Sequence, residues 1–165
     1  MNYKEYNREN AVKYAEKWAY SRNPRYYNFD SIGGDCTSFV SQCVFAGSDT
    51  MNYTKNTCWY YNSIKDRSPS WSGVEFLHNF LITNKGPGPR GKIVESDEIQ
   101  IGDIVQLRFE KSVFEHTLIV VNIEDAFDLN NIYTASHTYD SFNRRVSTYK
   151  FEDIRFIHIN NIATW

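Results

Sequence analysis

The spacing of apolar residues changes once along the chain, near residue 84. Three earlier segments repeat apolar residues at helical spacing and predict helices over residues 6–21, 36–46 and 74–83. Four later segments alternate or are rich in β-branched residues, and they predict strands over residues 102–109, 116–123, 132–138 and 155–159. Helices followed by an antiparallel sheet indicate an α+β domain.

Two finer expectations follow from the same spacing. Helix 74–83 is expected to bury Phe76, Leu77, Phe80 and Leu81. The glycine- and proline-rich stretch NKGPGPRGK, residues 84–92, is expected to be a loop between the helical and the strand-forming parts.

The size, charge and cysteine count of the chain limit the classes of protein to which it can belong. Its 165 residues suit a single domain spanning 1–165, and we expect a monomer. With 18 basic and 20 acidic residues, the chain lacks the excess of positive charge that is typical of nucleic-acid-binding proteins. No apolar run approaches the roughly 18 residues of a membrane span, and the N-terminus lacks the apolar core of a signal peptide. The three cysteines are an odd count, which disfavours a disulfide framework.

Cys36 stands out within the segment GGDCTSFVSQCVFAG, residues 33–47, because it opens the second predicted helix. Unpaired backbone N–H groups and the helix dipole favour a thiolate there, and they predict a pKa below the usual value of about 8.5. The alternative is a buried small hydrophobe, where most free cysteines are found. Cys43, two turns further on, is expected to be an inert core residue.

Two of the four histidines lie where they can serve such a cysteine. His116 opens the most β-branched strand, and His137 lies near the end of the next. A cysteine at a helix start, a base on a strand and an orienting group on the neighbouring strand form the cysteine-protease arrangement. Zinc held by Cys36, His116 and His137 is the chemical alternative, but no closely spaced ligand pair supports it. The serine-hydrolase signature G-x-S-x-G is also absent.

The residues quoted above belong to a longer pattern, YNRENAVKYAEKWAYSRNPRYYNFDSIGGDCTSFVSQCVFAG, residues 6–47. This pattern resembles the bacterial putative amidase domain family, whose hallmark is GGDCTNFVSQC. Ser38 replaces the usual asparagine. The later segments SDEIQIGDIVQL, EHTLIVVNI and YTASHTYD agree in the same order, so the resemblance covers nearly the whole chain.

The family is similar to the NlpC-type and CHAP papain-like cysteine hydrolases. The resemblance therefore implies a papain-like fold in which the helix bearing the cysteine packs on an antiparallel sheet bearing the histidine. It makes Cys36 the nucleophile and His116 the general base, without a metal or other cofactor. It favours His137 as the third catalytic residue, with Asp140 or Asn122 as alternatives.

The resemblance also suggests how the substrate is held. Tyr27 is the candidate for binding the oxyanion, and Asp35, next to the nucleophile, is a second candidate substrate-binding residue.

The implied substrate is peptidoglycan, cut either between sugar and stem peptide by an amidase or within the peptide by an endopeptidase. The chain is then expected to act on the cell wall, as a phage-type endolysin released through a holin pore or as a domain of a secreted protein. A separate wall-binding domain in the parent chain is a further expectation. The alternatives are a papain-like acyltransferase and a catalytically silent wall-binding domain.

Overall fold

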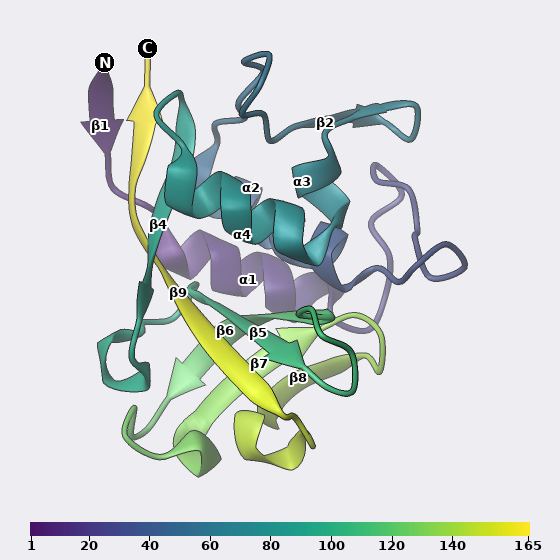
Figure 1. Cartoon of the computed structure of the whole chain (residues 1–165), viewed down its shortest axis with the longest axis vertical. Helices are drawn as coiled ribbons and strands as arrows, with labels where there is room; N and C mark the ends of the chain where they lie inside the picture. Colours follow the sequence, from purple (N-terminus) through teal and green to yellow (C-terminus); the bar gives the residue numbers. More distant parts are fainter.

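Helices cover one face of an antiparallel sheet in the computed structural model, which describes all 165 residues (Figure 1). The helices are α1 (Arg8–Trp18), α2 (Cys36–Ser48), α3 (Pro69–Ser72) and α4 (Val74–Thr83). The strands are β1 (Asn2–Lys4), β2 (Tyr61–Ser63), β3 (Asp66–Arg67), β4 (Gly88–Val94), β5 (Ile104–Arg108), β6 (His116–Ile123), β7 (Ile132–Ser136), β8 (Ser141–Arg145) and β9 (Asp153–Thr164). Short 3-10 turns follow at Ser96–Glu98, Leu129–Asn131 and Val146–Thr148. The domain is α+β, as predicted.

The seven-stranded sheet is built around β9. Six strands follow the order β1-β9-β5-β6-β7-β8, and the seventh, β4, also pairs with β9. β5 and β1 pair with successive parts of β9, so the two ends of the chain lie side by side (Figure 1). β2 and β3 form a separate hairpin. Every pairing is antiparallel, which agrees with the predicted sheet.

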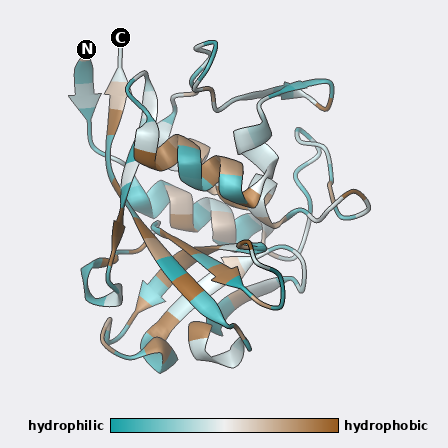
Figure 2. Cartoon of the chain, viewed as in Figure 1, coloured by the Kyte–Doolittle hydropathy of each residue, from teal (hydrophilic) through white to brown (hydrophobic).

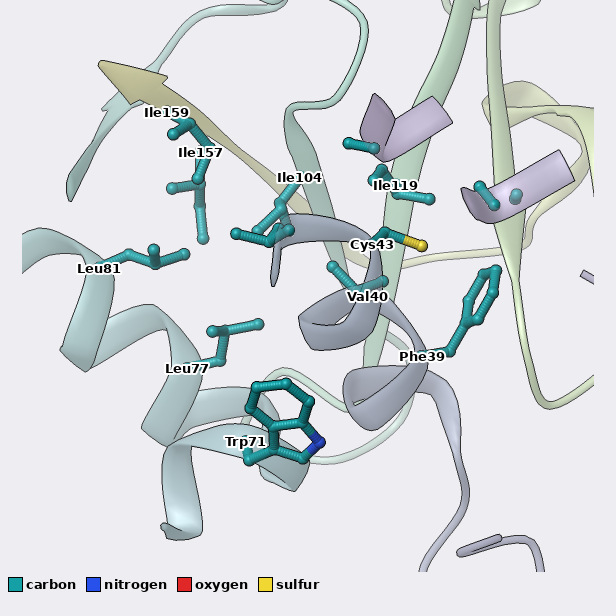
Figure 3. Packing of buried hydrophobic residues seen from close by; sticks show 14 of the residues in the cluster. Phe39, Val40, Cys43, Trp71, Leu77, Leu81, Ile104, Ile119, Ile157 and Ile159 are labelled. Atoms are coloured by element: carbon teal, nitrogen blue, oxygen red, sulfur yellow. The ribbon is translucent and has the colours of Figure 1, made fainter. Parts of the chain in front are cut away.

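Two hydrophobic clusters lie on opposite faces of this sheet. The larger joins the helices to inward-facing strand residues such as Ile104, Ile119 and Ile157 (Figure 3). The smaller lies on the other face and includes Leu118 and Tyr149. The alternation of hydrophobic and hydrophilic residues is visible along β9 (Figure 2). β6 lies between both clusters, which explains its nearly unbroken apolar sequence.

The strongest patterns are confirmed residue for residue: α4 and β6 have the predicted bounds. The loop expected over residues 84–92 is wrong, because Gly88–Val94 form β4. A Cβ at Gly91 would lie only 3.0 Å from Ile157 Cγ2 of β9, so this glycine permits close strand packing. Pro89 is tolerated because only β9 pairs with this strand. Glycine and proline are typical of turns, and for this reason the sequence pattern predicted a loop instead of a strand.

The expected burial of Phe76 is also wrong. Its side chain is 60% exposed, whereas Leu77, Phe80 and Leu81 are buried. Those three residues already fill the stripe that faces the sheet, and Phe76 lies beside that stripe in the first turn of α4.

Candidate active site

Helix α2 begins at Cys36, immediately after a tight backbone turn. Gly33 and Gly34 have φ values of +96° and +97°, a region that glycine enters without strain. A Cβ at Gly34 would lie 3.2 Å from the hydroxyl oxygen of Thr138, so the turn packs closely on the end of the β7 hairpin. The glycines therefore place the cysteine against the sheet.

Two threonines join the start of α2 to β6. The hydroxyl oxygens of Thr37 and Thr117 are 2.8 Å apart, and Gln106 donates to Thr117 Oγ1 at 3.3 Å. Thr117 follows His116 directly, and its backbone N–H lies close enough to the Cys36 sulfur to favour the thiolate. This junction brings the cysteine to the beginning of the strand that carries His116.

The Cys36 thiol is not activated in the resting structure in the way that its position suggested. The residue is only 7% exposed, and burial raises the pKa of the Cys36 thiol above its ordinary value. The Thr117 and Thr37 hydrogen bonds oppose this rise, and the nearby Asp35 carboxylate adds to it. The predicted lowering by the helix N-terminus is outweighed by burial.

His116 is buried and held by one ring nitrogen. Its Nε2 lies 3.3 Å from the hydroxyl of Ser136 on the neighbouring strand, and Ser136 Oγ lies 3.4 Å from the Tyr149 hydroxyl. Nδ1 makes no hydrogen bond, and the imidazole makes none with Cys36. The resting structure thus orients the ring through Ser136 and leaves the other nitrogen free to take a proton.

Both members of this pair are neutral at pH 7. Burial, with a smaller contribution from the Arg144 charge, lowers the pKa of His116 to about 4. With the thiol pKa raised, the ground state is a thiol and a neutral imidazole.

The buried neutral imidazole predicts acid sensitivity. At pH values between the ordinary pKa of 6.5 and the folded pKa of about 4, His116 is protonated in the unfolded chain but neutral in the folded chain. The free energy of unfolding should therefore fall as the pH drops through this window, by about 3 kcal/mol from this group. Urea unfolding at pH 7 and pH 4 should show a drop smaller by about this amount in His116→Gln than in the unaltered chain. Equal drops would contradict the burial argument.

His137 makes no hydrogen bond to His116, because both of its ring nitrogens have other partners. Its Nδ1 lies 2.6 Å from Asp35 Oδ2, and its Nε2 lies 2.8 Å from the Trp18 carbonyl oxygen. Its ring stacks on Phe39, with centroids 4.0 Å apart and planes at 15°. Alternation along the strand points His137 towards the helices, whereas Ser136 points to the face that carries His116.

The other candidate residues surround His137 rather than His116. Asp35 is buried, and its carboxylate accepts from the Phe29 backbone N–H at 2.9 Å and from His137. Arg22 lies 3.7 Å from the same carboxylate and binds Asp140 through two hydrogen bonds of 2.9 and 3.0 Å. Asp140 therefore pairs with Arg22, and it too leaves His116 without a contact.

The remaining candidates, Tyr27 and Asn122, make no hydrogen bond to the His116 imidazole. Tyr27 is 39% exposed; its ring packs edge-on to Phe29, and its hydroxyl makes no hydrogen bond. Asn122 is exposed near the far end of β6 from His116. No group of three or more His, Cys, Asp or Glu side chains is arranged to hold a metal ion.

A groove of about 640 Å³ opens on His116. Its walls include aromatic and cationic side chains from β8 and the turns beside it, among them Tyr139, Arg144 and Tyr149. Thr138 also lines the groove, and it lies against Gly34, two residues before the cysteine. The imidazole of His116 therefore lines an open groove.

Sequence reasoning missed Ser136 and Thr117 as site residues. Ser136 carries no titratable group and precedes a histidine that attracts attention. The available signal was strand alternation: residues 136 and 137 must point to opposite faces, and only one of them can meet His116.

Comparison with known proteins places the chain in a family. It is 32% identical over 160 residues to the uncharacterized protein YhbB of Bacillus subtilis strain 168, covering 90% of this chain and 46% of that protein. It is 27% identical over 143 residues to the uncharacterized protein YjcM of the same strain, covering 81% of this chain and 31% of that protein. The chain thus spans less than half the length of these two relatives.

No solved structure matches the chain significantly, and no helix is long and apolar enough to cross a membrane. The model of the putative amidase domain matches residues 5–160. The chain therefore belongs to the putative amidase domain family.

Proposed function

We propose that the chain is a papain-like cysteine amidase in which Cys36 is the nucleophile and His116 the general base. One observation carries the proposal: the Thr37–Thr117 contact and the Thr117 backbone N–H hold the Cys36 thiol at the start of β6, and the residue before Thr117 is His116, whose imidazole has one free nitrogen. Family membership supports amide chemistry. Nucleophilic catalysis by a thiol requires a base that can take its proton, and the neutral imidazole of His116 is the proposed base.

The proposed reaction has two steps. The Cys36 sulfur attacks the amide carbonyl while His116 takes the thiol proton, forming a tetrahedral oxyanion. The unpaired backbone N–H groups at the start of α2 stabilise this oxyanion, and Tyr27 is proposed to assist. The imidazolium then protonates the leaving amine, and a thioester remains. Water, deprotonated by His116, cleaves the thioester and releases the carboxylate and the thiol.

We assign the orienting role on His116 to Ser136, not to His137. An orienting group holds the nitrogen that does not take the proton, and Ser136 contacts Nε2 from an adjacent strand. His137 instead positions Asp35, which precedes the nucleophile. Because the hydroxyl acts through the imidazole, Ser136 is a positioning residue.

The proposed substrate is peptidoglycan, cut at the sugar–peptide amide or within the stem peptide. The resemblance to cell-wall hydrolases supports this choice, and the groove at His116 offers aromatic and charged walls for a peptide or sugar. A place of action at the cell wall follows from the same proposal.

Digestion of purified peptidoglycan tests the substrate and the bond together. We expect soluble fragments, identified by mass spectrometry, whose masses show one added water per cleaved amide. A freed lactyl carboxylate would identify an amidase, and a new amine inside the stem peptide an endopeptidase. A digest identical to one without protein would contradict the proposed substrate.

A further inference from the structure

The groove that opens on His116 contains more positive charge than the chain itself neutralises. Arg144 and Lys150 both line it, and neither forms an ion pair. The single acidic residue of the wall, Glu115, is already engaged: its carboxylate accepts from the backbone N–H groups of Phe109 and Lys111 and pairs with the Lys111 side chain. The free charge in the groove is therefore cationic.

The Arg144 side chain is held in place although no carboxylate binds it. Its Nε donates to the Thr148 hydroxyl at 2.8 Å, one terminal nitrogen donates to the Thr148 carbonyl at 3.3 Å, and its guanidinium lies 3.6 Å from the centre of the Tyr149 ring. The other terminal nitrogen makes no hydrogen bond. A fixed guanidinium with free donors suits a planar carboxylate.

The turn between β7 and β8 forms another wall of the groove. Thr138 and Tyr139 have φ values of +63° and +59°, although neither is glycine and threonine is β-branched. Both residues line the groove, and Tyr139 is 82% exposed. The two hydrogen bonds from Arg22 to Asp140 hold the turn in this conformation. Positive φ at both central residues is the geometry that a tight turn between two antiparallel strands requires, and here it presents both side chains to the groove.

We propose that this groove binds an acidic peptide segment of the substrate, with Arg144 binding its carboxylate and determining specificity. The inference rests on the proposed amide hydrolysis, and it adds the chemical class of the segment beside the scissile bond. Lys150 adds a second cation, and Tyr139 and Tyr149 provide surfaces for the peptide backbone and its apolar parts.

The Arg144 charge also acts on the catalytic base. It contributes to the lowered pKa of His116. A bound carboxylate would offset that charge, so an acidic substrate would strengthen the base as it binds.

Binding of small peptides tests this inference without requiring turnover. N-acetyl-alanyl-glutamate and the same dipeptide with every carboxylate amidated are titrated into the full chain carrying Cys36→Ala, at pH 7, and followed by the backbone amide signals in NMR. The acidic dipeptide should bind at least about tenfold more tightly and shift signals along β8 and the 138–140 turn. Arg144→Gln should abolish this preference.

Arg145→Gln is the matched control. It removes the same charge one residue away, on the other face of β8, where Arg145 contacts the Tyr133 hydroxyl. The preference should persist in this variant. Equal affinities for the two dipeptides, no binding of either, or a preference that survives Arg144→Gln would overturn the inference. Because binding is measured, this failure is distinct from a failure to digest peptidoglycan.

Discussion

Replacing Cys36 with alanine is expected to remove amide hydrolysis, with a loss of at least about 10⁴-fold in turnover. The sulfur is the only atom that can form the proposed thioester, and no other residue at the start of β6 can replace it. The fold should remain, because the change removes one atom at a helix start and keeps the Thr37–Thr117 contact. Release of soluble peptidoglycan fragments measures the activity, and urea unfolding measures stability.

Cys43→Ala is the matched control for this variant. Cys43 is fully buried in the larger cluster, beside Val40 of α2 and Ile119 of β6 (Figure 3). Its loss should lower the free energy of unfolding by a few tenths to about 2 kcal/mol while the folded protein stays active. A Cys36→Ala protein that digests at a comparable rate, or a folded but inactive Cys43→Ala protein, would reverse the two assignments.

The parts of the fold that sequence predicted are those with one unambiguous period. α4 and β6 have long apolar patterns that few alternatives can satisfy, and their bounds agree with the structure. β4 was missed because its glycines and proline are turn residues in most contexts, and only the partner strand β9 shows why they fit.

The arrangement of the site shows the same dependence on long-range register. Sequence reasoning selected Cys36 and His116, and the Thr37–Thr117 contact joins the helix start that carries the first to the strand start that carries the second. The side chain that holds the imidazole depends on how β7 pairs with β6. That pairing contains an irregularity between Val120 and Asn122, and no local pattern encodes it. A shift of one residue exchanges Ser136 for His137.

The second large effect is expected where Asp35 and His137 meet. Each ring nitrogen of His137 has a buried hydrogen-bond partner, the Asp35 carboxyl group or the Trp18 carbonyl. Removing either side chain leaves a buried polar group without its partner, which typically costs about 1–3 kcal/mol. Asp35→Ala and His137→Ala should each lower the free energy of unfolding by at least this amount, because the His137 ring also packs on Phe39.

The double variant separates this explanation from simple loss of packing. With both hydrogen-bonding partners gone, it should be more stable than the sum of the single effects predicts, by at least about 1 kcal/mol. Asp140→Ala is the control: it removes an exposed partner of Arg22 and should cost no more than about 1 kcal/mol. Additive losses in the double variant, or an Asp140 effect as large as that of Asp35, would show that the buried pair is not the cause.

Comparing His137→Ala with variants of Ser136 decides which residue orients His116. Ser136→Ala should slow turnover by about tenfold or more and move the acidic limb of the pH–rate profile, because the hydrogen bond on Nε2 is lost. Ser136→Thr keeps a hydroxyl and should recover part of both. His137→Ala should reduce stability first, and its folded fraction should keep the pH profile of the unaltered chain. If the His137 variant moves the profile while the Ser136 variant leaves it in place, the orienting group is the histidine, and the strand face assigned to it is wrong.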